Sequence, residues 1–287
     1  MNNFFDFFGR PEDIGCMFQH SGVSRHQGRR HKAPHLPEGE VPGHDCQYHA
    51  DGLKGDIAFA VSRDELKPAL TGVLFRFGKK ELTAVATDGH RLVRYTRSDY
   101  SADEFSGDVI VPRKFLSMLS GVLGEGESIQ MWMGDNHMTA AIGEDTYFTR
   151  IIDERFPDFE SVIPKDNDRE LSVNQNVLLS AARRVSIFSN KSTHQIALRL
   201  TKNKIELTTE DPEKASKAQE KIYGEFSGDD LVIGYNASYL KDILSHIDNE
   251  TVIIKLKTSI SAALFYPGTQ GENSNLTMLL MPIRLND

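Results

Sequence analysis

Short segments of alternating apolar and polar residues recur along most of the chain, with turn-forming residues between them. Such alternation is typical of half-buried β-strands. In the first half of this region it predicts strands over residues 72–77, 81–86, 109–111, 128–133, 137–142 and 147–152. In the second half it predicts strands over residues 196–200, 204–209, 231–233, 251–256, 259–265 and 276–283. Gly78, in the first connection, favours a hairpin between the strands beside it.

Three segments instead place apolar residues at helical spacing. Pro112 suits the first position of a helix whose apolar stripe is Phe115, Leu116, Leu119 and Val122. Residues 174–189 predict a second helix, one side of which carries Leu178, Ala181, Ala182, Val185 and Phe188. Asn236 is expected to cap a third helix with the apolar residues Tyr239, Leu240, Ile243, Leu244 and Ile247. Ser62 to Glu65 has the form of a capping box, but Pro68 limits any helix there to a short piece.

The order of strands and helices in the first half recurs in the second. Matching residues lie 123 positions apart in the pairs Leu82 and Ile205, Asp88 and Asp211, and Val109 and Val232. A repeat of this length has the size of a domain and is too long for a solenoid unit. The sequence therefore predicts an α+β fold of two tandem copies of one domain, each with antiparallel sheets and two helices.

Residues 1–55 differ from the rest of the chain, because they hold six of the ten histidines and little apolar periodicity. Cys16, His20, Cys46 and His49 have the side chains of a zinc site, and the basic run 25–32 could contact nucleic acid. We favour a poorly ordered leader, since the spacing matches no common zinc pattern and no apolar frame surrounds it. The expected domains are residues 1–55, 56–165 and 166–287.

Composition narrows the class of protein. The chain has 287 residues and a formal net charge of −8. It contains no apolar run of about 18 residues, the length that would span a membrane. Both cysteines lie in the first fifty residues, which excludes a disulfide scaffold for the remainder and favours a cytoplasmic location. The acidic total argues against a protein that coats itself with DNA, but it permits a local basic surface.

The one pair of residues that suggests acid–base chemistry is Asp88 and His90. No nucleophile signature or glycine-rich phosphate loop accompanies them. Asp88 and Gly89 are better explained as a turn at the end of a strand. We therefore expect no catalytic residues, no cofactor and no metal.

Five segments of the chain resemble one family, the bacterial sliding clamp, which is the beta subunit of DNA polymerase III. They are residues 87–92 (Thr-Asp-Gly-His-Arg-Leu), 109–114 (Val-Ile-Val-Pro-Arg-Lys), 155–159 (Arg-Phe-Pro-Asp-Phe), 234–239 (Gly-Tyr-Asn-Ala-Ser-Tyr) and 281–285 (Met-Pro-Ile-Arg-Leu). That family builds a subunit from three copies of one domain, and two subunits close a ring around DNA. The resemblance covers about residues 56–285 and matches the second and third copies. It implies that the first strand and much of the first helix of the second copy are missing or shortened.

The resemblance implies a non-enzymatic processivity factor of the replicative DNA polymerase, with a groove that binds linear peptide motifs. The matching groove residues are Leu70, Thr87, Gly89, His90, Arg91, Leu92, Pro157, Val162, Asn236, Tyr239, Leu279, Leu280, Met281, Pro282, Ile283 and Arg284. The leucines and Val162 suit an apolar wall, Met281 an adaptable contact, and the polar residues a hydrogen-bonding rim. Ser161 stands where some relatives carry arginine.

The partners implied are double-stranded DNA bound without sequence preference, the polymerase catalytic subunit, the clamp loader and other proteins with clamp-binding motifs. Diffuse phosphate attraction calls for basic residues near helices. The candidates are Arg63, Lys67, Arg113, Lys114, Arg183, Arg184 and Lys241. Ile187 and Phe188 match a subunit interface whose partner surface is on the absent first copy, so a homodimer is doubtful for this chain. The alternative is a peptide-binding scaffold that does not encircle DNA.

Overall fold

A computed structural model describes residues 44–49, 57–98, 106–123 and 128–285. The first repeat contains β1 (His44–His49), η2 (Ala58–Ala60), η3 (Pro68–Thr71), β2 (Gly72–Phe77), β3 (Leu82–Thr87), β4 (Arg91–Arg97), β5 (Gly107–Pro112), α1 (Arg113–Val122), β6 (Ser128–Met133), β7 (His137–Ile142) and β8 (Asp145–Arg150). The second contains β9 (Arg169–Asn174), α2 (Gln175–Ser186), β10 (Gln195–Thr201), β11 (Lys204–Asp211), η4 (Pro212–Lys214), β12 (Ser216–Tyr223), β13 (Glu225–Ser227), β14 (Leu231–Asn236), α3 (Ala237–Ser245), β15 (Thr251–Leu256), β16 (Ala263–Pro267) and β17 (Ser274–Leu280).

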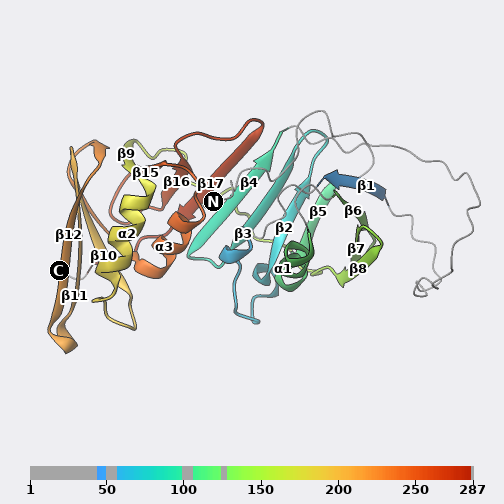
Figure 1. The fold of residues 1–287 in the computed structure, drawn as a ribbon, viewed down its shortest axis with the longest axis horizontal. Helices are drawn as coiled ribbons and strands as arrows, with labels where there is room; N and C mark the ends of the chain where they lie inside the picture. The colour runs from blue at the N-terminus through green and yellow to red at the C-terminus, as the bar shows by residue number, and fades with distance from the viewer. Residues whose placement is uncertain (1–43, 50–56, 99–105, 124–127, 286–287) are drawn as a thin grey trace, which may run out of the picture.

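The strands form three antiparallel sheets (Figure 1). Two four-stranded sheets have the orders β1-β6-β7-β8 and β12-β11-β10-β14. The third has nine strands in the order β13-β9-β15-β16-β17-β4-β3-β2-β5 and extends across both repeats. The pairing of β17 with β4 joins the repeats, with Leu279 opposite Leu92. The two copies are therefore linked by a continuous hydrogen-bonded ladder as well as by the chain.

Strand β1 corrects one prediction. We expected the first strand of the first repeat to be missing or shortened, and we assigned residues 1–55 to a separate segment. Residues His44–His49 instead pair with β6, with His44 opposite Met133. In the second repeat β9 pairs with β15 in the same way, so β1 occupies the place of the first strand. Of the proposed zinc ligands, Cys46 and His49 belong to β1, whereas Cys16 and His20 lie outside the described part of the chain, as does the basic run 25–32.

Helices α2 and α3 pack between one face of the nine-stranded sheet and a four-stranded sheet, since α2 contacts β9 as well as β11 and β12, and α3 contacts β17 as well as β14; α1 contacts β5. The main core on this face includes Leu116 of α1, Leu178 of α2 and Leu240 of α3. A smaller apolar cluster fills the opposite face and consists of Leu74, Val85, Leu92, Ile110, Phe159, Leu264 and Leu279. The expected helical faces are buried with three exceptions: Tyr239 is half-buried, Val122 is 44% exposed, and Phe188 is 45% exposed because α2 ends at Ser186.

Local chemistry explains where the helices begin. The side chain of Asn236 accepts hydrogen bonds from the amides of Ser238 (2.9 Å) and Tyr239 (3.4 Å), as a helix cap does. Asn174 caps α2 through the amide of Val177 at 3.0 Å. In the first repeat η2 and η3 lie between β1 and β2, where the second repeat has α2. Residues 50–56 of this interval lie outside the described part of the chain, so the shortened first helix stays a prediction. Among the described residues, no helix is long and apolar enough to cross a membrane.

Candidate functional site

The loop between β3 and β4 is a tight turn built by Asp88. Its Oδ1 accepts hydrogen bonds from the amides of His90 (2.9 Å) and Arg91 (3.0 Å), and Gly89 adopts a φ of 91° that suits glycine. The Thr87 hydroxyl donates to the carbonyl of Arg91 at 2.7 Å. Asp88 is thus used in holding the turn, as the sequence predicted, and the turn positions His90 and Arg91.

Arg91 connects three elements at the junction of the repeats. Its Nε donates to Asp88 Oδ2 at 3.0 Å, and its Nη1 donates to Asp242 Oδ2 on α3 at 2.7 Å. Its Nη2 donates to the carbonyl of Phe59 at 3.0 Å. The guanidinium also lies over the rings of Phe59 and Tyr239, at 5.1 and 4.7 Å from their centres. The side chain is only 9% exposed, so Arg91 supports the site from within.

The chain after β17 crosses this junction and contacts both repeats. The amide of Met281 donates to the carbonyl of His90 at 2.9 Å, and the amide of Ile283 donates to the carbonyl of Gly234 at 2.9 Å. The Met281 side chain remains 42% exposed. The His90 ring stacks on Tyr239, with centroids 5.8 Å apart. Exposed apolar and hydrogen-bonding groups from both repeats therefore lie together.

Tyr239 has a perturbed phenol. Burial raises its pKa, and the carboxylates of Asp88 and Asp242 raise it further, while Arg91 opposes the shift. The phenol therefore stays protonated well above neutral pH. It can donate a hydrogen bond to a ligand at this surface.

The apolar part of the predicted groove lies on the other face of the sheet. Leu92 and Leu279 pair across the junction and belong to the smaller apolar cluster. Ala69 and Ile163 pack against that cluster, which places their neighbours Leu70 and Val162 at its border. Val162 is 54% exposed, as expected of a residue that lines a groove. Phe156 and Phe159, which the sequence reasoning did not select, also belong to this cluster or contact it.

Other predicted groove residues take different places. Leu280 is fully buried in the main core, because it points away from Leu279 across the sheet. Asn236 uses its side-chain oxygen as the cap of α3. Of the remaining predicted positions, Pro157 and Arg284 are exposed, and Pro282 is half-buried. The structure thus brings the two sides of the predicted site together around β4 and β17, and it moves Leu280 from the groove wall to the core.

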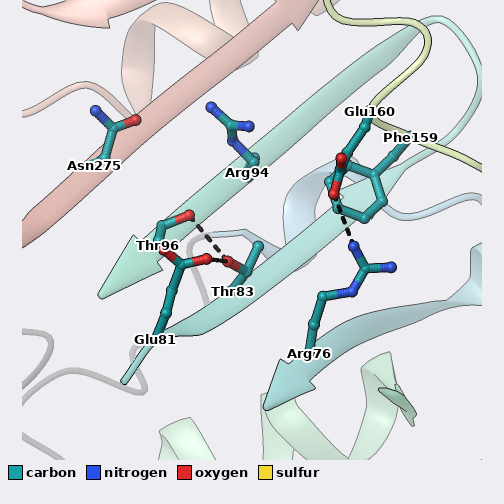
Figure 2. Close-up of a pocket in the computed structure, with 8 residues that line it drawn as sticks. All are labelled: Arg76, Glu81, Thr83, Arg94, Thr96, Phe159, Glu160 and Asn275. Atoms are coloured by element: carbon teal, nitrogen blue, oxygen red, sulfur yellow. Dashed lines mark hydrogen bonds and ion pairs between the residues drawn. The ribbon is translucent and has the colours of Figure 1, made fainter. Parts of the chain in front are cut away.

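A polar pocket of about 330 Å³ opens on the same sheet face as the apolar cluster (Figure 2). It is lined by Arg76, Glu81, Thr83, Arg94, Thr96, Phe159, Glu160 and Asn275. Arg76 pairs with Asp108 and Glu160 at 3.0 and 2.9 Å, and these carboxylates, Asp108 above all, raise its pKa. Arg94 follows Leu92 by two residues and so points to the same face. Its buried Nε has no hydrogen-bond partner among the described residues. No motif in the sequence marks this pocket.

The candidate DNA-contacting residues are surface residues on the side of the sheet that carries the helices. Lys114 and Arg183 are exposed on α1 and α2, and Arg113 is half-buried. Two others are engaged by neighbours: Arg184 forms a bidentate pair with Glu220, and Lys241 donates to the Ser186 hydroxyl at 3.0 Å. Arg63 and Lys67 are exposed near η3. Two of the seven candidate cations therefore already have partners within the described structure.

The predicted interface residues are exposed at the end of α2. Ile187 is 76% exposed, and the carbonyl of Phe188 accepts a hydrogen bond from Ser216 at the start of β12 at 3.3 Å. Three residues of the junction were missed: Phe59, Asp242 and His246, whose ring stacks on Phe59 at 3.9 Å. They come from segments without a recognisable motif, and they are revealed by the contacts of Phe59 and Asp242 with Arg91 and by the stacking of His246 on Phe59. Within the described residues, no group of three or more potential metal ligands occurs.

Two tandem α+β repeats, joined edge to edge by a shared sheet and lined by helices on one face, define a two-domain clamp fold. The sequence profile for the central domain of the DNA polymerase III beta subunit matches residues 52–158, and that for its C-terminal domain matches residues 160–284. The chain belongs to the DNA polymerase III beta subunit family, the bacterial sliding clamps.

Individual relatives agree. The chain is 33% identical to the beta sliding clamp of Pseudomonas putida over 229 residues and 31% identical to that of Escherichia coli K12 over 228 residues. Each match covers 79% of this chain and 61% of the relative, so the chain spans about three fifths of their length. A crystal structure of the Pseudomonas aeruginosa clamp bound to griselimycin superposes with a TM-score of 0.80 at 30% identity, covering 88% of this chain and 68% of that one.

Proposed function

We propose that this chain is a sliding-clamp processivity factor, which tethers the replicative polymerase and other partners to DNA through a peptide-binding groove. The observation that carries this proposal is the junction itself. A surface is assembled from both repeats and is fixed by Arg91, and it leaves Met281, His90 and Tyr239 accessible, while Val162 is exposed beside the smaller apolar cluster. A site that needs both repeats suits a protein whose role is docking.

The surface fits an extended peptide with one polar anchor and aliphatic side chains. Val162 provides exposed apolar contact at the border of the cluster that buries Leu92, and Met281 can adapt to different side chains. His90 and the protonated Tyr239 can hydrogen-bond an amide such as glutamine. The polar pocket lies farther along the same strands, and Arg94 there can contact polar residues that flank the motif. A small interface of this kind supports roughly micromolar affinity.

DNA contact would use the helix-covered side of the molecule. Arg113 and Lys114 are the strongest candidates, because they place two adjacent cations at the start of α1, where Lys114 is exposed. Such contacts attract phosphates without reading bases, which is what movement along DNA requires.

A second function has one specific observation in its favour. Arg184 is paired with Glu220, and Lys241 is bonded to Ser186, so two of the seven candidate DNA contacts are satisfied within the protein. This weaker basic surface favours a peptide-binding scaffold that does not encircle DNA.

The two functions differ in how the protein is retained on DNA. The chain would be incubated with closed circular DNA, washed at high salt, and the retained protein measured before and after linearisation. A chain that encircles DNA should stay on the circles during the wash and be released only when the DNA is linearised. A scaffold that does not encircle DNA should already be released by the wash. Calorimetry with a glutamine-containing aliphatic peptide measures docking separately. Absence of peptide binding by a folded chain would contradict both functions.

A further inference from the structure

Polar side chains continue the smaller apolar cluster along the same face of the nine-stranded sheet. In the ladder between β4 and β17, Leu92 lies opposite Leu279, and Arg94 lies opposite Thr277. Residues two apart on a strand share a face and lie about 7 Å from each other. Arg94 therefore comes directly after the apolar pair, and it lines the polar pocket together with Asn275 of β17 (Figure 2).

The guanidinium of Arg94 has donors that the protein does not satisfy well. Its Nη2 donates to the Thr277 hydroxyl at the long distance of 3.5 Å, and its buried Nε has no hydrogen-bond partner among the described residues. A buried donor without an acceptor is costly. Arg76 in the same pocket is different, because it pairs with Asp108 and Glu160 at 3.0 and 2.9 Å. Arg94 is thus the arginine of this pocket that has most to gain from an incoming acceptor.

Two further groups beside Arg94 suit an anion. Burial raises the pKa of Tyr266, and the positive charge of Arg94 opposes this shift, so the two side chains interact. The Nζ of Lys255 lies 5.9 Å from the centre of the Tyr266 ring. Lys255 is opposite Leu264, a member of the smaller apolar cluster, and therefore faces the same side of the sheet. A phenol that can donate a hydrogen bond thus lies near two cations.

The nearby carboxylates have partners of their own. Glu160 is held by Arg76, and Glu81 accepts a hydrogen bond from the Thr83 hydroxyl at 3.3 Å. Figure 2 shows Glu81 beside Thr83 and Thr96, whereas the guanidinium of Arg94 points away from them. The repulsion that an anion at Arg94 would meet is therefore reduced by these pairings.

We propose that Arg94, Tyr266 and Lys255 form a subsite for a carboxylate of the docked peptide. This inference rests on the proposed peptide-binding groove and deepens it. The order along β4 is His90, Leu92 and Arg94, so a hydrogen-bonding, an apolar and a cationic position follow one another. An extended peptide advances about 3.3 Å per residue. A carboxylate about two residues beyond the aliphatic side chain at Leu92 would therefore reach Arg94.

The chemistry of a carboxylate matches the three groups. Its two oxygens can accept hydrogen bonds from the guanidinium and from the phenol, and charge-assisted bonds of this kind are stronger than neutral ones. Lys255 adds attraction without a fixed geometry. The carboxylate can belong to a glutamate side chain or to the C-terminus of the peptide.

Matched peptides test the subsite in the full chain. Each carries a glutamine and aliphatic residues, followed two positions later by Glu, Gln or Lys, and each has an amidated C-terminus. Calorimetry at low salt should show roughly threefold to tenfold tighter binding of the Glu peptide than of the Gln peptide. The Lys peptide should bind more weakly than the Gln peptide, and the advantage of Glu should shrink as salt is added. A fourth peptide, which ends at the tested position with a free carboxylate, distinguishes a chain end from a side chain.

Variants locate the effect. Arg94→Met with Lys255→Met removes both cations, and the ratio of the Glu and Gln affinities should fall to about one. Lys255 is exposed, so Lys255→Met alone should leave the fold intact and should give an intermediate ratio. Arg199→Met is the matched control, because it removes an exposed arginine from β10 in another sheet, and it should keep the full ratio.

The outcomes separate this inference from the groove itself. Equal affinities for the Glu, Gln and Lys peptides, or the same ratio in the double variant as in Arg199→Met, would overturn the subsite and leave the groove standing. No binding of any peptide by the folded chain would contradict the groove and the subsite together. A gain confined to the peptide with the free C-terminus, and lost in the double variant, would support the subsite and assign it to a chain end.

Discussion

Arg91 Nη1 lies 2.7 Å from Asp242 Oδ2, and this ion pair joins β4 of the first repeat to α3 of the second. The Arg91 side chain is 9% exposed, whereas that of Asp242 is 49% exposed. The pair therefore sits at the edge of the core, where the guanidinium is desolvated and its partner is not. The other bonds of Arg91 fix the turn at Asp88 and the segment at Phe59, so one side chain sets the geometry of the junction.

Replacing Arg91 should weaken the whole junction. Arg91→Ala leaves Asp88 and the Phe59 carbonyl without their donor, and we expect a loss of at least about 2 kcal/mol in the free energy of unfolding. Arg91→Lys keeps the charge but not the planar fork of donors, so it should recover only part of the loss. Asp242→Asn removes only the exposed partner and should cost less than either. Urea unfolding measures all three, and equal midpoints for Arg91→Ala and the unaltered chain would contradict this role.

The C-terminal segment should contribute directly to peptide binding. Met281→Ala combined with deletion of residues 283–287 removes the adaptable side chain and the bond from Ile283 to Gly234. We expect peptide affinity to fall at least tenfold by calorimetry. Deletion of residues 286–287 alone is the control and should leave affinity unchanged. Unchanged affinity in the larger deletion would show that the peptide docks elsewhere.

Gly234 lets this segment approach β14 closely. A Cβ atom at this position would stand 2.8 Å from the carbonyl oxygen of Ile283 and 2.6 Å from a methyl group of Leu285. Gly234→Ala should therefore push the segment outward and weaken peptide binding several-fold, with little change in the core beneath. Gly121→Ala is a matched control, because nothing lies within 4 Å of its Cβ position and alanine favours a helix. Equal peptide affinities for the two variants would rule out a role for this close approach.

Much of the fold could be predicted because its signals are local. Residues 128–133 and 137–142 form β6 and β7 with the expected bounds, and Asn236 caps α3 as its sequence context indicated. Strand β1 was not predicted, since its sequence offers only Cys46 and Tyr48 as alternating apolar positions, and the register with β6 defines it. The periodicity also extended α2 to Phe188, two residues beyond Ser186, where the helix ends.

Only part of the candidate site could be predicted from the sequence. Motif residues such as His90 and Met281 lie together because β17 pairs with β4, a contact between segments almost two hundred positions apart. Leu279 and Leu280 are adjacent and equally apolar, so the sequence could not tell which one joins the smaller apolar cluster. The alternation of the strand decides it and places Leu280 in the core. Phe59 and Asp242 have no sequence signal, because their contribution is made through Arg91.

The start of α1 should carry much of any attraction to DNA. Arg113→Glu with Lys114→Glu should lower non-specific association and reduce the slope of log affinity against log salt by about 2, if both side chains contact phosphates. Leu116 and the rest of the buried face of α1 are unaltered, so the fold should survive. Lys79→Glu with Lys80→Glu, in the turn after β2, changes net charge equally and is the control. Equal losses in both double variants would indicate a general charge effect and would exclude a specific role for α1.

The pair between Arg184 and Glu220 should restrain DNA binding. Arg184 lowers the pKa of the Glu220 carboxyl, chiefly through their hydrogen bond, so the carboxylate stays charged until the pH falls below its ordinary range. Any stability from this pair is therefore present at neutral pH and is lost as the pH falls through the lowered pKa.

Glu220→Gln removes the negative charge and leaves Arg184 available to phosphates, so DNA affinity at neutral pH should rise and its salt dependence should steepen by about 1. Fluorescence anisotropy across a salt series measures both quantities. Glu210→Gln, which removes an equal charge at an exposed pair with Lys217, should leave the slope unchanged. If the two variants behave alike, Arg184 does not face DNA.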